Sequence, residues 1–470
     1  MIANPYTLKP PAEDMTLDAL QDSRVTVVGG ARSGIAVARL LRSAGATVFL
    51  SEHGVLADER VRLLREANVS FEAGGHTGRA LEADFLVVSP GVPTTAEVVQ
   101  QAIRRALPVY SEVEVASWFC LAPIVAITGS NGKTTTTRIA AHLFETAGRH
   151  TVIAGNIGLA FSDQVREATS RSVVVLEVSS FQLDHIDRFR PQVSVLLNIT
   201  PDHLNRYDNS FEAYAAAKLR IIANQQAGDV CIYNHDDTHI RTHITESAHA
   251  QGFTPVAISQ KEEVETGAFL RDGNIIIRIE NHEEILMQAQ DRSPALAGRH
   301  NLYNSLAAAM AGRVMEVRSE VIRKSLATFE GVPHRLEWVR TVDGVRYVND
   351  SKATNVNAVW YALESYSEPV VLIAGGRDKG NDYSSLVPLI EEKARAVVAI
   401  GESKEKVLRE LGSHAPEAVA ADSMDGAIGE ARRLAQRGDV ILLSPACSSF
   451  DMFENYEDRG DTFRRIVNKL

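Results

Sequence analysis

The sequence has few cysteines, few aromatic residues and no long apolar run. Its three cysteines, Cys120, Cys231 and Cys447, are far apart among 470 residues, and none belongs to a CxxC pair. They offer neither a disulfide framework nor a cysteine metal site, which favours a reduced compartment. No apolar stretch is long enough to cross a bilayer, and the N-terminus lacks a cationic start followed by an apolar core. We therefore expect a cytoplasmic protein that does not insert into a membrane.

An excess of basic charge is absent as well. The chain has 49 Lys and Arg against 60 Asp and Glu, which gives a formal net charge of −11. Without a global positive field we expect no nucleic-acid partner, and any anionic substrate must be held by a local pocket. The length predicts about three domains, at roughly 150 residues per domain. We expect a monomer.

Strand-like apolar runs alternate with helical patterns almost throughout the chain. This alternation is typical of a doubly wound α/β fold. The pattern restarts twice and predicts three tandem α/β domains: a Rossmann-like domain over 1–112, a central P-loop ATPase-like domain over 113–331 and a Rossmann-like C-terminal domain over 332–470. Asp272 and Gly273 indicate a hairpin turn, and hence a small antiparallel segment in the central domain.

A glycine-rich turn follows the first predicted strand. Residues 29–34 read GGARSG and open a helix, and Glu52 lies just after the next strand. Ala31 stands where a dinucleotide fingerprint requires its second glycine. Three interpretations remain open: a nicotinamide or flavin site, a phosphate or nucleotide-sugar site, and a purely structural turn. The helix N-terminus offers free N–H donors to a diphosphate.

A second glycine-rich loop, at the start of the central domain, predicts ATP binding. Residues 127–135 read ITGSNGKTT, between a strand and a helix, a shorter variant of the common phosphate loop. The backbone N–H groups of such a loop face phosphate oxygens, its lysine neutralises the phosphates and its hydroxyl binds Mg²⁺. The residues expected to do this are Gly129, Ser130, Asn131, Gly132, Lys133, Thr134 and Thr135.

Three further residues of the central domain carry chemistry at the predicted sheet edge. Glu177 ends a strand, where its charge needs a metal or solvent, although a loop or cap carboxylate remains an alternative. His203 follows the next strand in NITPDHLNRY, and a hydrogen-bonded structural histidine remains the alternative there. Lys218 lies in the helical segment YAAAKLR, and the residues alone indicate a solvated helix lysine.

The loop TGSNGKT, followed by Glu177, His203 and Lys218, resembles the corresponding motifs of the Mur ligase family. That family shares its loop with folylpolyglutamate synthases. The resemblance implies that Lys218 carries a CO₂-derived carbamate, which turns a cation that repels Mg²⁺ into an anion that holds it. It implies two Mg²⁺ sites, with metal ligands Thr134, Glu177, His203 and the Lys218 carbamate. The catalytic residues implied are Lys133, His203, Lys218 and Asn156.

Other segments match the family in order along the chain. Residues 155–158 (GNIG) resemble the family's loop near the acyl acceptor, and residues 298–304 resemble its nucleotide-contacting GxHNxxN segment. Read without the resemblance, Asn301 and Asn304 are an N-cap and a helix-face polar residue. The further ATP-binding residues implied are Asn301, Asn304, Arg335 and Asp350. The implied UDP-sugar contacts are Ala31, Arg32, Ser33, Ser51, Asn156 and Ser179.

The last third resembles the D-glutamate-adding members in particular. The segments DSKATN at 350–355, GGRDKG at 375–380 and LSPACSSFD at 443–451 carry the likeness, and the DNPR segment of other members is absent. The amino-acid-binding residues implied are Lys352, Thr354, Lys379, Ser449 and Tyr456. Structural alternatives remain an exposed turn lysine for Lys379 and a helix N-cap for Ser449.

The resemblance thus implies an ATP-dependent ligase of peptidoglycan biosynthesis, and so of cell shape and division. Such an enzyme joins D-glutamate to UDP-N-acetylmuramoyl-L-alanine through an acyl phosphate and releases ADP and phosphate. Three alternatives stay open. They are another Mur-type or folylpolyglutamate-type ligase with a different acceptor, a nicotinamide-dependent oxidoreductase, and a nucleotide-gated binding protein without catalysis.

Overall fold

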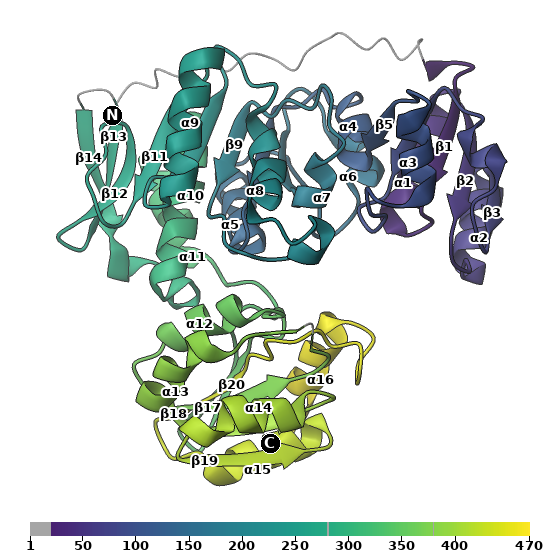
Figure 1. Cartoon of the computed structure of the whole chain (residues 1–470). Coiled ribbons are helices and arrows are strands. Elements are labelled where there is room, and N and C mark those ends of the chain that lie inside the picture. The colour runs from purple at the N-terminus through teal and green to yellow at the C-terminus, as the bar shows by residue number, and fades with distance from the viewer. Residues whose placement is uncertain (1–19, 280–281, 379) are drawn as a thin grey trace. The chain divides into compact units, whose positions relative to one another are not determined.

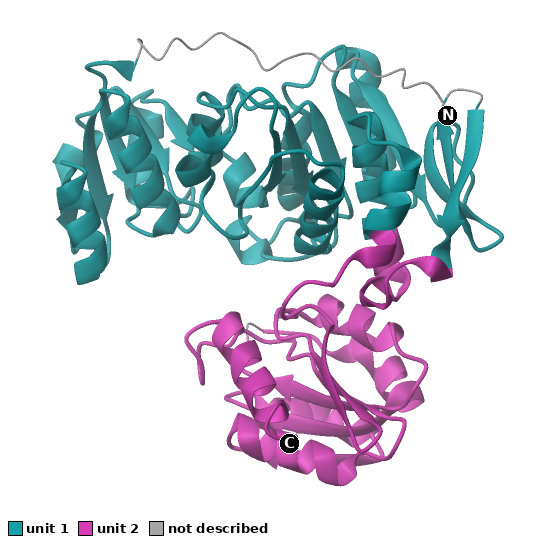
Figure 2. Ribbon diagram, turned by 180° about the vertical axis from the view of Figure 1, so that it is seen from behind, with its two compact units in different colours: residues 1–289, 303–325 teal, residues 290–302, 326–470 magenta. Residues whose placement is uncertain are grey.

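The computed structural model describes residues 20–279, 282–378 and 380–470. Its contacts divide the chain into two compact units, Met1–Ala289 with Tyr303–Ser325, and Gln290–Leu302 with Leu326–Leu470 (Figure 2). The first unit contains two β-sheets and the second contains one. Within the described ranges, no helix combines the length and apolar character that a membrane span requires.

The first sheet has five parallel strands in the order β3-β2-β1-β4-β5. Strands β1, β2 and β4 are short, mostly apolar runs that are largely buried, which is typical of the centre of a parallel sheet covered by helices, whereas the outer strands β3 and β5 are more exposed. Strand β1 lies where the strand order reverses, the position at which such sheets bind ligands at their carboxyl ends. The elements are β1 (Arg24–Val28), α1 (Arg32–Ser43), β2 (Thr47–Glu52), α2 (Asp58–Glu66), β3 (Ser70–Ala73), β4 (Phe85–Val88), α3 (Glu97–Arg104) and β5 (Val109–Ser111) (Figure 1).

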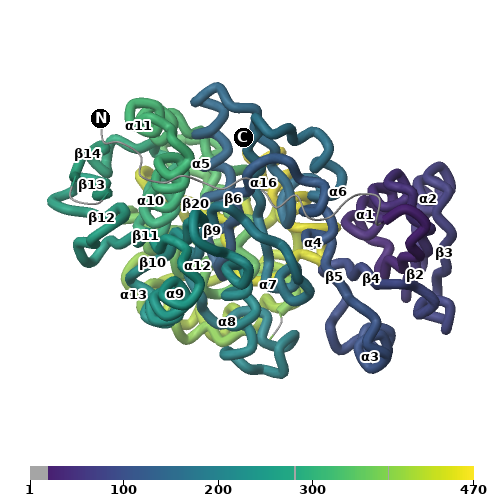
Figure 3. The backbone as a smooth tube through the Cα atoms, turned by 90° about the horizontal axis from the view of Figure 1, so that it is seen from above, coloured from purple at the N-terminus to yellow at the C-terminus, as the bar shows by residue number. Residues whose placement is uncertain are grey.

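The second sheet has nine strands in the order β14-β13-β12-β11-β10-β9-β6-β8-β7, and β9 lies between β6 and β10 (Figure 3). The strands are β6 (Ile124–Thr128), β7 (Thr151–Gly155), β8 (Val173–Glu177), β9 (Val193–Leu196), β10 (Val230–Asn234), β11 (Thr254–Ser259), β12 (Gly267–Arg271), β13 (Asn274–Ile279) and β14 (His282–Gln288). The hairpin predicted at Asp272 and Gly273 is confirmed, because β12 and β13 pair antiparallel across that turn.

Further helices of the first unit precede, connect or follow the strands of this sheet. They are α4 (Glu112–Ser117), α5 (Lys133–Thr146), α6 (Phe161–Gln164), α7 (Ser180–Leu183), α8 (Phe211–Leu219), α9 (Thr238–Gln251), and also α10 (Arg299–Val314) and α11 (Ser319–Thr328), which each run into the other unit's residues. The register pairs Ile127 with Glu177 and Thr128 with Leu196. The carboxyl ends of β8 and β9 therefore border the loop that follows β6.

A buried carboxylate fixes the segment after α7. Glu114 is fully buried in α4, and its two oxygens accept hydrogen bonds from the backbone N–H groups of Asp187, Arg188 and Phe189 at 2.7–3.1 Å. The indole of Trp118 donates a further bond of 2.7 Å. Successive backbone N–H groups that converge in this way form an anion-binding nest, and here a side chain of the same chain occupies it.

The second unit contains a six-stranded sheet in the order β15-β16-β20-β17-β18-β19, in which only the β15–β16 pair is antiparallel. Its elements are β15 (Glu337–Val342), β16 (Val345–Asn349), α12 (Val356–Glu364), β17 (Val370–Gly375), α13 (Val387–Lys393), β18 (Ala394–Ile400), α14 (Lys404–Glu410), β19 (Glu417–Ala421), α15 (Met424–Leu434), β20 (Val440–Leu443) and α16 (Tyr456–Val467). The predicted fold class, three α/β domains in tandem, is confirmed. The domain boundaries at 112 and 331 remain a proposal.

Candidate active site

The loop between β6 and α5 needs glycine where the sequence places it. Gly132 adopts a left-handed conformation, with φ of 84°. A Cβ atom there would lie 2.4 Å from Oδ1 of Asn304, closer than real Cβ contacts allow. Asn304 is itself fixed, because its Oδ1 accepts a hydrogen bond from Thr136 of α5 at 3.1 Å. The asparagine therefore packs directly against the loop rather than lying on a solvated helix face.

Residues after β9 support the loop from its other side. The Asn198 side chain accepts from the backbone N–H of Asn131 at 2.8 Å and donates to its carbonyl at 3.1 Å. The hydroxyl of Ser130 donates to the carbonyl of Thr200 at 2.8 Å and lies 2.9 Å from the Tyr214 hydroxyl. Our sequence analysis missed Asn198, Thr200 and Tyr214, because their role depends on β9 pairing with β6.

Two lysines share one carbonyl oxygen of the loop. Nζ of Lys133 donates to the carbonyls of Gly129 at 2.7 Å and Ser130 at 2.8 Å. Nζ of Lys218 donates to the same Gly129 carbonyl at 2.9 Å and lies 4.7 Å from the centre of the Tyr214 ring. Helix α8 thus places a second amine beside the phosphate loop.

The Lys218 amine is deeply buried, with 2% of the residue exposed. Burial, and next the nearby Lys133 charge, lower its pKa well below the usual value, although Asp202, Glu177 and Asp184 raise it in part. The amine is therefore uncharged in a larger fraction of molecules at a given pH than an ordinary lysine amine is. The alternative of a solvated helix lysine is wrong.

A buried carboxylate with one unused oxygen lies at the end of β8. Glu177 is 1% exposed, and its Oε1 accepts a hydrogen bond from Nδ2 of Asn156 at 3.0 Å. Its Oε2 is buried and has no hydrogen-bond partner among the described residues. A buried carboxylate oxygen without a donor is costly, and a cation beside it would relieve that cost. Asn156 is held in place, because its backbone N–H donates to the Glu177 carbonyl at 2.9 Å.

His203 lies in the loop after β9, and its side chain is about half exposed. It has a left-handed backbone, with φ of 52°, and its Nε2 lies 3.7 Å from Oδ2 of Asp202. Its ring makes an edge contact with Phe181 at 5.3 Å between ring centres. In the described part of the chain, no three His, Cys, Asp or Glu side chains form a metal-binding group on their own. A metal at this edge would need ligands of other kinds.

The first glycine turn presents backbone donors, one of which a carboxylate already occupies. Glu52 accepts from the N–H of Gly30 at 2.5 Å and from that of Gly54 at 2.7 Å. Burial raises the pKa of Glu52, but these hydrogen bonds, together with the His76 and Arg60 charges, leave the pKa below its usual value. Arg32 and Ala31 are exposed at the first turn of α1, where the helix has no side-chain cap. The free helix terminus suits a diphosphate.

Two of the residues expected at the sugar nucleotide use their side chains within the fold. The buried Ser51 hydroxyl donates to Glu72 at 2.6 Å and lies 2.7 Å from Nδ1 of His76. Ser179 is the N-cap of α7 and forms a capping box with Gln182. Both hydroxyls already donate within the fold, so either would have to give up that bond before it could donate to a ligand.

In the second unit, Asp350 lies at the end of β16 and is deeply buried. Its oxygens accept from the backbone N–H of Leu336 at 3.2 Å and from the Ser444 hydroxyl at 2.8 Å. Burial raises the pKa of Asp350 to about 6, although the nearby Arg335 charge lowers it. Nε of Arg335 is buried and has no partner among the described residues. The arginine is thus available to an anionic ligand.

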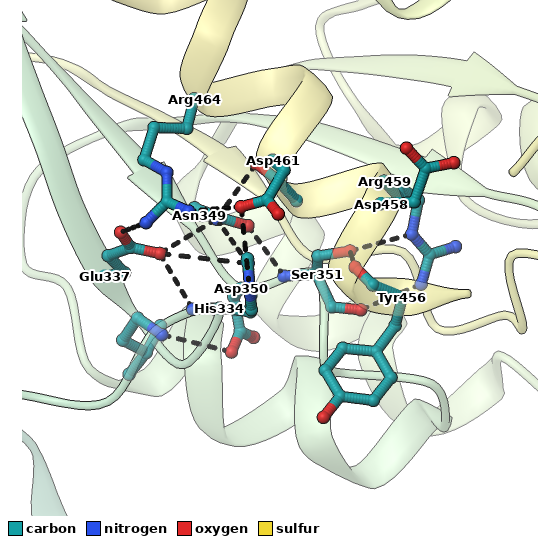
Figure 4. Close-up of polar contacts among 12 residues, drawn as sticks. His334, Glu337, Asn349, Asp350, Ser351, Tyr456, Asp458, Arg459, Asp461 and Arg464 are labelled. Atoms are coloured by element: carbon teal, nitrogen blue, oxygen red, sulfur yellow. Dashed lines mark hydrogen bonds and ion pairs between the residues drawn. The ribbon is translucent and has the colours of Figure 1, made fainter. Parts of the chain in front are cut away.

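Arg459 connects the segments that border Asp350. Its buried guanidinium donates to the Ser351 hydroxyl at 2.9 Å and to the Ser351 carbonyl at 2.8 Å (Figure 4). It also donates to the Cys447 carbonyl at 3.1 Å. The Ser351 hydroxyl in turn donates to the Tyr456 carbonyl at 2.8 Å. One side chain therefore fixes three of the segments that carry the predicted amino-acid residues.

Lys352, Thr354, Ser449 and Tyr456, four of the predicted amino-acid residues, lie on these segments. Nζ of Lys352 is 5.2 Å from the centre of the Tyr456 ring, and the Thr354 backbone N–H donates to the Lys352 carbonyl at 3.0 Å. Ser449 is buried, but the N-cap of α16 is Asn455, so the N-cap alternative for Ser449 is wrong. Lys379 lies outside the described residues.

Asn301 belongs to the first turn of α10. Its Nδ2 donates to the Ala297 carbonyl at 2.9 Å, and the helix begins two residues earlier at Arg299, so the N-cap alternative is wrong here too. Burial lowers the pKa of the neighbouring His300 to about 4, with help from the Arg335 and Arg292 charges. His300 is therefore neutral at physiological pH.

Comparison with known proteins identifies the family. Three family models match successive parts of the chain: the MurD N-terminal domain at 24–98, the Mur ligase middle domain at 127–312 and the Mur ligase, glutamate ligase domain, at 334–447. The chain belongs to the Mur ligase family. The matched ranges include the glycine turn, the phosphate loop with Lys218, and the segments around Asp350.

Curated relatives resemble this Mur ligase over almost its full length. The UDP-N-acetylmuramoylalanine–D-glutamate ligase of Salinibacter ruber is 61% identical over 461 residues, which cover 97% of this chain and 100% of the relative. The protein of the same name from Chloroherpeton thalassium is 46% identical over 469 residues, with 97% and 100% covered.

Solved structures share the fold of this Mur ligase at low identity. A pseudomurein peptide ligase type C from Methanothermus fervidus aligns with a TM-score of 0.59 and 18% identity, over 95% of this chain and 100% of the other. The MurF ligase from Thermotoga maritima, solved in complex with ADP, aligns with a TM-score of 0.58 and 16% identity, over 97% of both chains. At such identity the likeness establishes the three-domain architecture alone.

Proposed function

We propose that this Mur ligase joins D-glutamate to UDP-N-acetylmuramoyl-L-alanine, at the expense of ATP, with release of ADP and phosphate. The proposal rests on the groups around the Gly129 carbonyl. The amines of Lys133 and Lys218 both donate to this oxygen, and the carboxylate of Glu177 lies at the end of β8, which pairs with β6. The two curated relatives of that name support the choice of substrates. The reaction would be a cytoplasmic step of peptidoglycan biosynthesis, carried out by a monomer.

The phosphate loop would hold the triphosphate. Backbone N–H groups of Gly129, Ser130, Asn131 and Gly132 would face its oxygens, and Thr135 would lie in the first turn of the following helix. Lys133 would exchange the carbonyls of Gly129 and Ser130 for phosphate oxygens, which gives it a charged partner in place of two neutral ones. The nucleotide contacts proposed beyond the loop are Asn301, Asn304, Arg335 and Asp350.

The residues at the sheet edge fit Mg²⁺. The buried Glu177 Oε2 lacks a donor, and carboxylate and hydroxyl oxygens are ligands that Mg²⁺ accepts, so Glu177 and Thr134 would hold it. The family resemblance adds the imidazole of His203 as a further ligand. When bound, Mg²⁺ would neutralise charge on the transferred phosphoryl group. Lys218 as an ammonium would oppose a cation here. Its lowered pKa supports the neutral amine, which reacts with CO₂ to form a carbamate with loss of one proton.

The chain's own residues would then guide two displacements. The alanine carboxylate attacks the γ-phosphorus, an O–P bond forms, and the bond to the bridging oxygen of ADP breaks, while Lys133 stabilises the negative charge. The amine of D-glutamate attacks the carbonyl carbon of the acyl phosphate. The C–O bond to phosphate breaks, and the amine loses its proton. Asn156, held against Glu177, would orient the acceptor near its carboxylate.

The sugar nucleotide would bind to the first and central parts of the chain, and D-glutamate to its last third. The proposed sugar-nucleotide contacts are Ala31, Arg32, Ser33, Ser51, Asn156 and Ser179. The proposed D-glutamate contacts are Lys352, Thr354, Lys379, Ser449 and Tyr456. A cationic ammonium beside an aromatic ring, as Lys352 is beside Tyr456, suits a dicarboxylic amino acid, because the cation can pair with a carboxylate and the ring can cover its methylenes.

One assay tests this proposal. Phosphate release is measured with UDP-N-acetylmuramoyl-L-alanine and a panel of amino acids: D-glutamate, L-glutamate, L-lysine and meso-diaminopimelate. We expect turnover with D-glutamate alone, and none in the Lys133→Met variant, which keeps the side-chain length but not the charge. Turnover with a pteroate acceptor, or with another amino acid, would replace the proposed substrates.

A further inference from the structure

Arg206, in the loop after β9, forms hydrogen bonds to the loop that follows β4. Arg206 ends a short 3₁₀ turn, Leu204–Arg206, that directly follows His203. Its guanidinium donates to the carbonyls of three successive residues, Pro90 at 3.4 Å, Gly91 at 3.4 Å and Val92 at 3.2 Å. The planar fork of arginine suits such a row of acceptors, which the single point charge of lysine cannot match.

The loop that Arg206 contacts also packs against the first glycine turn. The hydroxyl of Ser89 donates to the Gly29 carbonyl at 2.9 Å. A Cβ atom on Gly29 would lie 2.9 Å from Cγ2 of Val92, so the loop and the turn are in direct contact. Any shift of the loop that Arg206 holds therefore shifts the turn proposed to bind the sugar nucleotide's phosphates.

The other face of the guanidinium packs on the ring of Phe181. The Arg206 Cζ atom lies 4.3 Å from that ring's centre, a cation–π distance. The same ring contacts His203 by its edge and stacks with Tyr207 at 6.0 Å between centres. Tyr207 is anchored in turn, since its hydroxyl donates to Asp184 at 3.2 Å. Arg206 and His203 thus contact the same aromatic ring, that of Phe181.

We propose that Arg206 is a positioning residue that sets the distance between the glycine turn and the phosphate loop. The inference rests on the proposed function. A sugar nucleotide anchored by its diphosphate at the glycine turn must place its distant carboxylate at the γ-phosphate, and a small misplacement of the reacting atoms costs much rate. Arg206 connects the glycine turn, where the acceptor's diphosphate would bind, to the segment that carries His203. It therefore determines how far the acceptor's carboxylate lies from the γ-phosphate.

The test compares Arg206→Gln with Arg188→Gln, a matched control on an exposed arginine of the neighbouring segment. In Arg206→Gln we expect the KM for UDP-N-acetylmuramoyl-L-alanine to rise about tenfold, the effect of one lost charge-assisted hydrogen bond. The KM for D-glutamate and the affinity for ADP stay within about twofold. Arg206→Lys recovers part of the loss, and Phe181→Leu shows a smaller loss in the same direction.

Direct binding of the acceptor, measured by calorimetry, gives a readout that does not depend on turnover. A wild-type enzyme that forms no product with D-glutamate overturns the proposed function itself. A wild-type enzyme that is active, beside an Arg206→Gln variant with an unchanged acceptor KM and affinity, overturns only the role of Arg206. An equal loss in all three kinetic constants, with a lowered melting temperature, also overturns it, because that pattern belongs to a general loss of structure.

Discussion

Replacing Glu114 with glutamine tests whether the buried anion nest holds the first unit together. Glutamine keeps the shape of the side chain and removes its charge. With its oxygen in the place of Oε2, it still accepts from the N–H groups of Asp187, Arg188 and Phe189, the three bonds made at 2.7–3.1 Å. Its amide group then faces the Trp118 indole N–H, which loses its acceptor.

The expected cost follows from these contacts. A hydrogen bond to a charged group contributes about 1.5–3 kcal/mol, and a neutral one about 1 kcal/mol. The loss of the Trp118 bond and the weakening of three others add to about 3–5 kcal/mol. For a unit of this size, that corresponds to a melting temperature lower by about 5–8 °C.

Differential scanning fluorimetry measures the shift, and Glu97→Gln is the matched control. Glu97 accepts comparable bonds from Gln101 and Arg104, but on an exposed helix face. We expect no measurable change in the control. If Glu114→Gln melts together with the control and the wild type, the four bonds do not carry the stability assigned to them here.

Three further predictions concern the proposed site. Lys218→Ala nearly abolishes ligation, and a short carboxylic acid restores part of it by replacing the carbamate; full activity without the acid would remove the carbamate. Gly132→Ala lowers ATP turnover at least tenfold, since the left-handed backbone alone costs about 1–2 kcal/mol and its Cβ meets Asn304; kinetics with saturating acceptor measure this, and wild-type turnover would contradict it. The pKa of Asp350 is raised from 3.8 to about 6, so the folded protein holds the protonated carboxyl more tightly than the unfolded chain does. The resulting stabilisation is complete below pH 3.8 and is lost as the pH rises through about 6. Asp350→Asn therefore removes about 3 kcal/mol of pH dependence between those values, which melting curves across that range measure; parallel curves for the two proteins would refute it.

Local patterns were sufficient for the elements and for the phosphate loop. The strand, glycine loop and helix around residues 127–135 follow from a buried apolar run and a turn that only glycine tolerates at Gly132. The hairpin at Asp272 and Gly273 follows from turn chemistry in the same way. Each of these features is encoded by residues adjacent in the sequence.

Features that depend on strand order could not be read in this way. Asn198 and Tyr214 support the phosphate loop because β9 pairs with β6 although β7 and β8 intervene in the chain. Lys218 seemed a surface residue by its type, but the alanines and Leu219 around it leave α8 with no polar face. That lack of amphipathicity is a signal of burial that the sequence does carry.

The shared acceptor at Gly129 has a consequence for the order of events. While Lys133 remains on that carbonyl, its charge helps to keep the Lys218 amine unprotonated. In the proposed reaction a triphosphate would draw Lys133 away, so this repulsion would weaken and protonation of Lys218 would become easier. The proposed carbamate would therefore form more readily before the nucleotide binds than after it.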